Sequence, residues 1–174
     1  GAGNNLSSRA SAIYLFSEVS RAKALFSQSF RSPTPFEQYF KPSTVTVLGN
    51  PDLKPERTDT FELSYLASKG GFFWRLTSYY TKYTDTIFRN LGDFTRDGAA
   101  YSAVNFYDNA PAYSSTGMEL EGRYEGKRTH AFLAAERTWG GRGDEHPIPA
   151  PGVFGLPGAS SWNFKYVPVY TVAG

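Results

Sequence analysis

Residues 60–81 of the chain read TFELSYLASKGGFFWRLTSYYT, two alternating runs on either side of the turn-forming residues Lys69-Gly70-Gly71. In the first run Phe61, Leu63 and Tyr65 alternate with Thr60, Glu62 and Ser64. In the second, Phe72, Trp74, Leu76 and Tyr80 oppose Arg75, Thr77 and Thr81. A period of two places apolar side chains on one face of an extended strand and polar side chains on the other. The stretch therefore predicts two strands joined by a tight turn.

The same alternation continues on both sides of this stretch and predicts five more strands. They cover residues 6–16, 19–30, 118–124, 129–139 and 161–166. Helical periodicity is poor throughout, and aromatic residues, which favour strands, make up 17% of the chain. The sequence thus predicts an all-β, antiparallel up-and-down fold of about seven strands.

The connections between these strands alternate in length. Short ones fall near Ser17-Glu18, at Lys69-Gly70-Gly71 and at Glu125-Gly126-Lys127, and long ones cover roughly residues 31–59, 90–101 and 140–160. Successive connections of an up-and-down sheet emerge at opposite ends, so all short turns should share one rim. Outer-membrane β-barrels combine short periplasmic turns with long external loops. This pattern favours a transmembrane barrel over a soluble sandwich or lipocalin-like barrel.

Alternation alone leaves the direction of the two faces open. A soluble barrel turns its apolar face inward, whereas a membrane barrel turns it toward lipid and lines its interior with polar side chains. The sequence contains no run of 18 apolar residues, so it predicts no transmembrane helix. It has no Cys, which excludes disulfides and thiolate metal sites. Its 18 basic and 16 acidic residues are spread along the chain, without the basic cluster that is typical of nucleic-acid binding. The start at Gly1, without Met, and the end at Gly174 suggest a chain cut from a longer protein.

One segment resembles a known family. Gly49-Asn50-Pro51-Asp52-Leu53-Lys54-Pro55-Glu56, with the strand that follows at 58–65, closely resembles a segment of TonB-dependent outer-membrane receptor barrels. Residues 27–34 (SQSFRSPT), 79–87 (YYTKYTDTI) and 109–121 (ending TGMELE) resemble further parts of these barrels in the same order. In the octapeptide, Asn50-Pro51-Asp52 favours a turn, and Pro55 favours an extended Lys54 that leads into the next strand. We therefore expect the octapeptide to have a structural role as the hinge between a loop and a strand.

The resemblance implies a segment of a 22-stranded transmembrane barrel in the bacterial outer membrane. It implies active transport of a scarce nutrient such as a siderophore, cobalamin or glycan, energised through TonB. Residues 1–174 would be a partial barrel domain, with the plug domain, the TonB box and the closing C-terminal strands absent. The implied partners are outer-membrane lipid, the TonB complex acting through the missing N-terminal region, and a small-molecule or metal-chelate ligand, but no nucleic acid. A soluble lipocalin-like or sandwich binding module, and a barrel enzyme or passive porin, are the alternatives.

Ligand contact is expected in the long loops, where arginine and aromatic side chains suit anionic or aryl-bearing ligands. The candidates are Arg31, Phe36, Tyr39, Arg89, Arg96 and Tyr107. No catalytic residue, cofactor or metal site is predicted. Asp144-Glu145-His146 lacks a second histidine nearby, and the Glu119 and Glu121 spacing is that of any alternating polar face. No phosphate-binding loop or nucleophile elbow is present.

Overall fold

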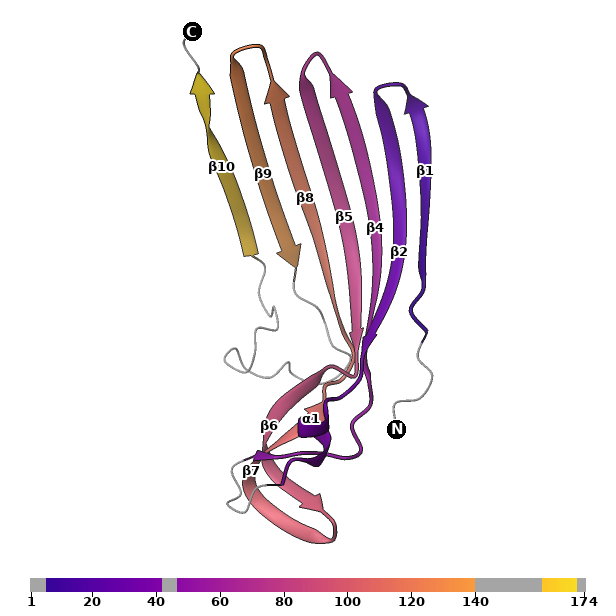
Figure 1. Cartoon of the computed structure of the whole chain (residues 1–174), viewed down its shortest axis with the longest axis vertical. Coiled ribbons are helices and arrows are strands. Elements are labelled where there is room, and N and C mark those ends of the chain that lie inside the picture. The colour runs from indigo at the N-terminus through magenta and orange to yellow at the C-terminus, as the bar shows by residue number, and fades with distance from the viewer. Residues whose placement is uncertain (1–5, 42–46, 140–160, 172–174) are drawn as a thin grey trace.

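A computed structural model of the chain describes residues 6–41 and 47–139 and the backbone of residues 161–171. Its main element is a 7-stranded sheet in which all neighbours are antiparallel, in the order β1-β2-β4-β5-β8-β9-β10 (Figure 1). The strands are β1 (Arg9–Ser17), β2 (Ser20–Arg31), β4 (Glu56–Lys69), β5 (Phe72–Thr84), β8 (Tyr113–Glu125), β9 (Thr129–Trp139) and β10 (Ser161–Thr171). All seven predicted strands are confirmed, and the fold is the expected antiparallel up-and-down barrel segment.

The connections of this sheet follow the predicted asymmetry. The β1–β2, β4–β5 and β8–β9 turns are short and lie together at the upper end in Figure 1. Gly70 and Gly71 form the middle turn with positive φ angles of 59° and 83°, which a residue without Cβ adopts at little cost. The connections from β2 to β4 and from β5 to β8 leave from the opposite end. The predicted loop at 140–160 lies outside the described residues.

The two long connections are folded, and here the prediction was incomplete. The first contains helix α1 (Pro35–Tyr39) and strand β3 (Val47–Leu48). The second, expected as a loop at 90–101, is a hairpin of β6 (Ile87–Arg96) and β7 (Ala99–Asn109). β7 also pairs with β3 in parallel, which gives a 3-stranded sheet in the order β3-β7-β6. Together with residues 49–56, these elements form what we call the loop layer.

Among the described strands β1 to β9, the large side chains on the apolar face of the large sheet are partly or fully exposed. Rows of paired residues such as Tyr14, Ala22, Tyr65, Leu76 and Leu120 run across it from strand to strand. Trp74 and Leu76 keep 46% and 41% of their surface accessible. In a small closed core these side chains would converge and be buried, so the structure does not support the soluble alternative. Trp162 and Phe164, predicted on this face, lie in β10, whose side chains are outside the described set.

Aromatic rings lie at both ends of the apolar face, and Phe16 contacts Tyr14 and Tyr65 between these ends. Phe26 and Phe61 contact each other at 4.8 Å between ring centroids toward the loop layer, with Tyr80 paired beside Phe61. Phe72 contacts Tyr124 at 4.5 Å at the turn end. Phe61 and the residue paired with Phe72 lie roughly 27 Å apart along β4 at about 3.4 Å per residue. A lipid-facing band about 25 Å tall between aromatic girdles is typical of outer-membrane barrels.

The opposite face of the sheet is polar and its side chains contact one another. Ser64, Thr77, Thr81 and Ser115 are buried on this face, although all are polar. Ser64 and Thr77 hydrogen-bond across β4 and β5 at 3.1 Å, and Thr60 and Thr81 do so at 3.3 Å. Charged residues of neighbouring strands also pair, as Arg75 does with Glu121. This is the arrangement expected of a hydrated barrel interior.

Candidate ligand-facing loop layer

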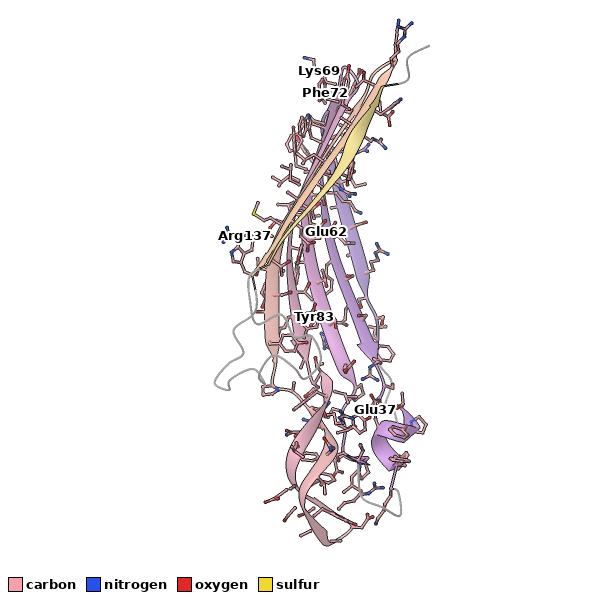
Figure 2. The ribbon with its side chains drawn as sticks, turned by 90° about the vertical axis from the view of Figure 1, so that its left-hand side faces the viewer. Glu37, Glu62, Lys69, Phe72, Tyr83 and Arg137 are labelled. Atoms are coloured by element: carbon pink, nitrogen blue, oxygen red, sulfur yellow. The ribbon has the colours of Figure 1, made fainter. Side chains whose placement is uncertain are left out.

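The loop layer contains the apolar core of the described chain. Its buried apolar side chains are Leu48, Leu53 and Phe106, and Ala110 is buried directly after β7; Leu48 is fully inaccessible. Phe94 and Phe106 stack on one face of the β6–β7 hairpin with centroids 4.5 Å apart. Because apolar burial is the main stabilising term in a folded unit, the loop layer has a defined packing of its own. It lies at the end of the sheet opposite Lys69 and Phe72, as the position of Glu37 in Figure 2 shows.

The first half of the octapeptide packs directly on α1. The Gly49 and Asn50 amides donate to the carbonyls of Phe40 and Glu37, both at 2.8 Å. A Cβ on Gly49 would lie 2.7 Å from the carbonyl carbon of Gln38, so only glycine allows this approach. The Asp52 amide donates to the Asn50 side chain at 3.0 Å, which closes an Asx turn around Pro51.

Asn109 joins the second half of the octapeptide to the hairpin. Its Oδ1 accepts from the Lys54 amide at 2.9 Å, and its Nδ2 donates to the carbonyls of Lys54 at 3.1 Å and Asp85 at 2.6 Å. Asp85 has a positive φ of 55° at the bend between β5 and β6. One side chain therefore fixes the end of β7, the start of β4 and the bend after β5.

An ion cluster joins α1 to the sheet. Arg31, the last residue of β2, contacts Glu56 at 2.6 Å and Glu37 at 3.0 Å. Hydrogen bonds to these carboxylates raise the pKa of Arg31 above its usual value. Partial burial of Glu37 favours its neutral form, but hydrogen bonds from Arg31 and Thr34 outweigh this and lower its pKa. Glu56 also accepts from the Ile87 amide at 2.6 Å, so the cluster reaches the hairpin.

The structure brings together three of the predicted ligand-contact residues. Phe36 on α1 meets Tyr107 on β7 edge-to-face at 6.2 Å, and Arg89 on β6 pairs directly opposite Tyr107. Residues paired in an antiparallel ladder share one face. Phe36 is half exposed and Arg89 is exposed. Tyr39, also exposed, lies three residues after Phe36 on the same helix α1. Phe36, Tyr39, Arg89 and Tyr107 form what we call the aromatic–arginine patch.

The other two predicted residues have partners within the loop layer. Arg31 belongs to the ion cluster with Glu37 and Glu56. Arg96 is 9% exposed and donates to the carbonyls of Phe40 at 2.9 Å and Gly49 at 3.0 Å. Both guanidinium groups hold the layer together. Asn109 and Tyr79 begin two of the segments that resemble the family, but neither was assigned a structural role from the sequence, because their partners are distant in the chain.

Tyr79 connects three strands on the polar face. Its ring lies over Gly117 of β8, and its hydroxyl lies 2.9 Å from Thr138 Oγ1 and 3.3 Å from Glu136 Oε1 on β9. A Cβ on Gly117 would meet the ring at 2.2 Å. The missing side chain of Gly117 therefore makes room for an aromatic group that closes the polar face over β5, β8 and β9.

The described part of the chain offers neither a metal site nor a membrane-spanning helix. No group of three His, Asp or Glu side chains there is arranged to hold a metal ion. No helix there has the length and apolarity needed to cross a membrane. The Asp144-Glu145-His146 triplet lies outside the described residues.

Comparison with known proteins places this architecture in a family. Residues 1–171 match the family model described as TonB dependent receptor-like, beta-barrel. No curated protein sequence matches significantly. Solved structures of similar fold include siderophore receptors and an iron transporter. The siderophore receptor PirA from Pseudomonas aeruginosa is 18% identical over 80% of this chain and 29% of its own, with a TM-score of 0.67.

Two further structures of similar fold come from other bacteria. The FrpB iron transporter from Neisseria meningitidis (F3-3 variant) is 19% identical over 80% of this chain and 20% of its own, with a TM-score of 0.58. The siderophore receptor PirA from Acinetobacter baumannii is 17% identical over 78% of this chain and 22% of its own, with a TM-score of 0.59. The chain thus spans less than a third of the length of each of these structures. It belongs to the TonB-dependent receptor β-barrel family.

Proposed function

We propose that the chain is a barrel section of a bacterial outer-membrane receptor that imports a scarce nutrient with energy supplied through TonB. The observation that carries this proposal is the division of one sheet into an exposed apolar face and a hydrogen-bonded polar face, with all described long connections folded at one rim. The plug, the TonB-contacting segment and the remaining strands belong to other parts of such a receptor. The proposed role of the receptor is transport, and no catalytic step is assigned to the residues of this chain.

The aromatic–arginine patch supports a ligand class. A cation beside exposed aromatic rings suits an anionic ligand that carries aryl or other flat groups. Ferric siderophores combine both properties, and the similar structures named above are siderophore receptors and an iron transporter. We therefore place a ferric siderophore ahead of cobalamin or a glycan, with Arg89, Phe36, Tyr107 and Tyr39 as its contacts.

Uptake of radiolabelled ferric siderophores tests this function. The full-length receptor is expressed in a bacterium without its own siderophore receptors, with and without a functional TonB gene. We expect saturable uptake of one siderophore class that disappears without TonB. Arg89→Ala should raise the half-saturating concentration about tenfold, because a hydrogen bond to a charged group is lost.

Arg128→Ala is the matched control. Arg128 is exposed in the β8–β9 turn at the opposite rim, so its removal should leave uptake unchanged. Uptake that persists without TonB, or a receptor that stays in the soluble fraction of broken cells, contradicts the proposed function. Equal effects of the two arginine variants contradict the assignment of the patch alone.

A further inference from the structure

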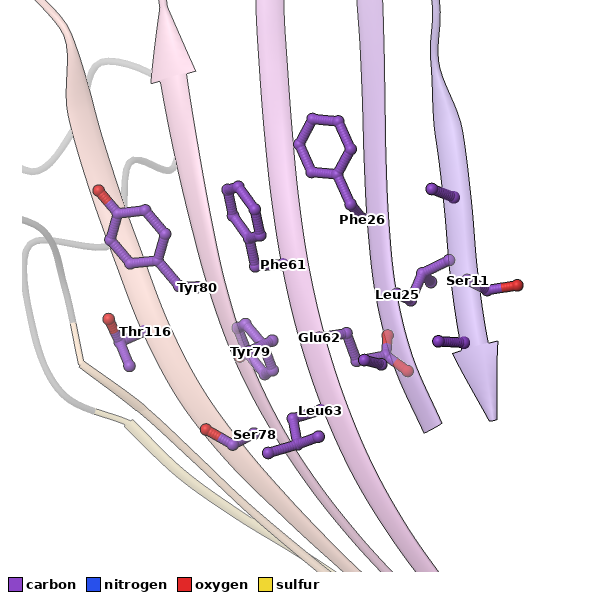
Figure 3. A pocket seen from close by; sticks show the side chains of 13 residues that line it. Ser11, Leu25, Phe26, Phe61, Glu62, Leu63, Ser78, Tyr79, Tyr80 and Thr116 are labelled. Atoms are coloured by element: carbon purple, nitrogen blue, oxygen red, sulfur yellow. The ribbon is translucent and has the colours of Figure 1, made fainter. Parts of the chain in front are cut away.

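The aromatic–arginine patch is built from two elements, so a ligand that touches all of it needs both elements held in one arrangement. Phe36 and Tyr39 lie on α1, whereas Arg89 and Tyr107 lie on the β6–β7 hairpin. The hollow drawn in Figure 3 lies elsewhere, since strands β1, β2, β4, β5 and β8 of the large sheet supply its lining. The contacts that fix α1 on the hairpin therefore decide the geometry of the patch.

α1 is too short to hold its own position. It has 5 residues, and isolated helices shorter than about 12 residues are marginal in water. Its N-terminal end is capped by Thr34 and is tied to Arg31 through Glu37. The last carbonyls of a helix lack partners within it and carry partial negative charge, so a cation from another element suits this end best.

Arg96 of β6 supplies that cation. Its Nη1 donates to the carbonyls of Phe40 at 2.9 Å and Gly49 at 3.0 Å, and its Nη2 donates to the Tyr39 carbonyl at 3.4 Å. The side chain is only 9% exposed, and its Nε lies 3.6 Å from a carboxylate oxygen of Asp97. The guanidinium is thus placed to hold the backbone at the end of α1 and is too enclosed to contact a ligand itself.

Ring contacts connect this hold to the patch. The ring of Phe40, whose carbonyl Arg96 binds, stacks on Phe36 with centroids 4.2 Å apart. Phe36 in turn meets Tyr107 edge-to-face at 6.2 Å. Arg96 lies at the other end of β6 from Arg89, roughly 24 Å along the strand at about 3.4 Å per residue. Loss of the Arg96 contacts should therefore change the patch through α1 and leave Arg89 in place.

We propose that Arg96 is a positioning residue for the ligand site. It holds the C-terminal end of α1 against the hairpin, so that Phe36 and Tyr39 stand beside Tyr107 before a ligand arrives. The apparent affinity is then not reduced by a share of receptors in which α1 lies elsewhere. The inference rests on the proposed function, because it takes the aromatic–arginine patch as the ligand site of the receptor.

Equilibrium binding to the purified full-length receptor tests the effect on affinity, with a radiolabelled ferric tris-catecholate complex as the probe. This complex is anionic and carries aryl rings, the two properties that the patch suits. Arg96→Gln should raise Kd about tenfold, the result expected when about a tenth of the receptors keep α1 in place. The number of binding sites should stay unchanged, whereas a folding defect alone would lower that number at the same Kd. Arg96→Lys keeps a charged donor and should raise Kd less.

Arg57→Gln is the matched control. Arg57 is exposed on β4, and its ion pair with Asp59, at 3.2 Å, lies within the sheet, so its loss should leave Kd unchanged. Combining Arg96→Gln with Phe36→Ala tests the route through α1. The double variant should lose clearly less affinity than the product of the two single losses, because the ring that Arg96 positions is already absent.

Spin labels test the same inference without a ligand. Single cysteines replace the exposed Tyr39 of α1 and Leu91 of β6, after any cysteines elsewhere in the receptor are replaced, and pulsed electron paramagnetic resonance measures the distances between the labels. The distances should be narrowly distributed in the receptor with Arg96 and broadly distributed with Arg96→Gln.

A Kd that Arg96→Gln leaves unchanged overturns the inference, as does an equally narrow distance distribution. If Arg96→Gln yields too few folded receptors, Arg96→Lys is judged by the same two measurements. Failure of the unaltered receptor to bind the probe contradicts the proposed ligand class, and the label distances still decide the role of Arg96.

Discussion

At the residue scale, the side chains with the most contacts in the loop layer are those that join segments distant in sequence. Arg31 and Arg96 were selected from the sequence for their charge, but their hydrogen-bond acceptors are 6 to 57 residues away. No local pattern indicates that two arginines bind carboxylates and carbonyls of their own chain while Arg89 remains exposed. The octapeptide is recognisable because its turn chemistry is local, whereas Asn109, which fixes it, has no local signature.

Asn109→Ala tests the importance of this connection. Three hydrogen bonds are lost and the Lys54 amide loses its acceptor, so the loop layer should lose about 2–4 kcal/mol of stability. Hydrogen exchange of the amides at 54 and 86–110 in the full-length receptor should become much faster, with strand amides of β4 and β5 unchanged. Asn90→Ala is the control, since the Asn90 side chain bonds only the adjacent Leu91 amide in the described structure. Exchange equally fast in both variants would argue against the connection.

The ion cluster predicts a dependence on pH. The pKa of Glu37 is lower in the folded chain than its usual value, so its ionised form stabilises the fold. This stabilisation is fully present above the unfolded carboxyl value of about 4.3 and is lost as pH falls through the lowered folded value. The protection of the α1 amides against hydrogen exchange, taken relative to the intrinsic exchange rate at each pH, should therefore fall in acid. Glu37→Gln should lower this protection at neutral pH, and the protection should then change less between neutral and acidic pH. An unaltered chain with no acid response would refute this role.

At the element scale, local alternation predicted the seven strands of the large sheet because each has one exposed apolar face. It missed β6 and β7 for a physical reason. The ladder shifts between Gly92 and Phe94, which breaks the period of two, and the turn at Asp97-Gly98 has the composition of a loop. α1 carries a complete capping box from Thr34 to Glu37, but a helix of 5 residues lacks the periodicity needed to detect it.

Strand β8 offers a test of packing between elements on the polar face. Gly117→Ala should displace the Tyr79 ring and its bonds to β9, at a cost of about 1–3 kcal/mol in unfolding free energy. Urea unfolding of the full-length receptor in lipid vesicles, followed by tryptophan fluorescence, measures this change. Tyr79→Phe should remove part of the same stabilisation, so the two changes should be less than additive. Gly92→Ala, whose Cβ would have an ordinary 3.8 Å contact with Phe106, should have little effect, and a loss as large as that of Gly117→Ala would argue against the packing explanation.

At the scale of the whole molecule, the sheet and the loop layer differ in where their apolar residues go. In the sheet they face outward and stay exposed, while in the loop layer Leu48, Leu53 and Phe106 are buried. A sheet with this pattern is stable only when its apolar face meets lipid and its polar face meets a hydrated interior. The sequence predicted the two faces of each strand but left their directions open, because alternation is the same in both cases. The contacts between polar side chains and the family match decide between them.

The orientation of the two faces is the central claim, and spin labels along β4 test it most directly. The chain has no Cys, so single cysteines at positions 60–66 can be labelled in the full-length receptor in lipid bilayers, after any cysteines elsewhere in it are replaced. Labels at Phe61, Leu63 and Tyr65 should be relaxed mainly by oxygen dissolved in the lipid, and labels at Thr60, Glu62 and Ser64 should be shielded from it. The reverse pattern, or labels at Leu63 and Tyr65 shielded from both oxygen and a water-soluble relaxing agent as in a closed core, would contradict the account.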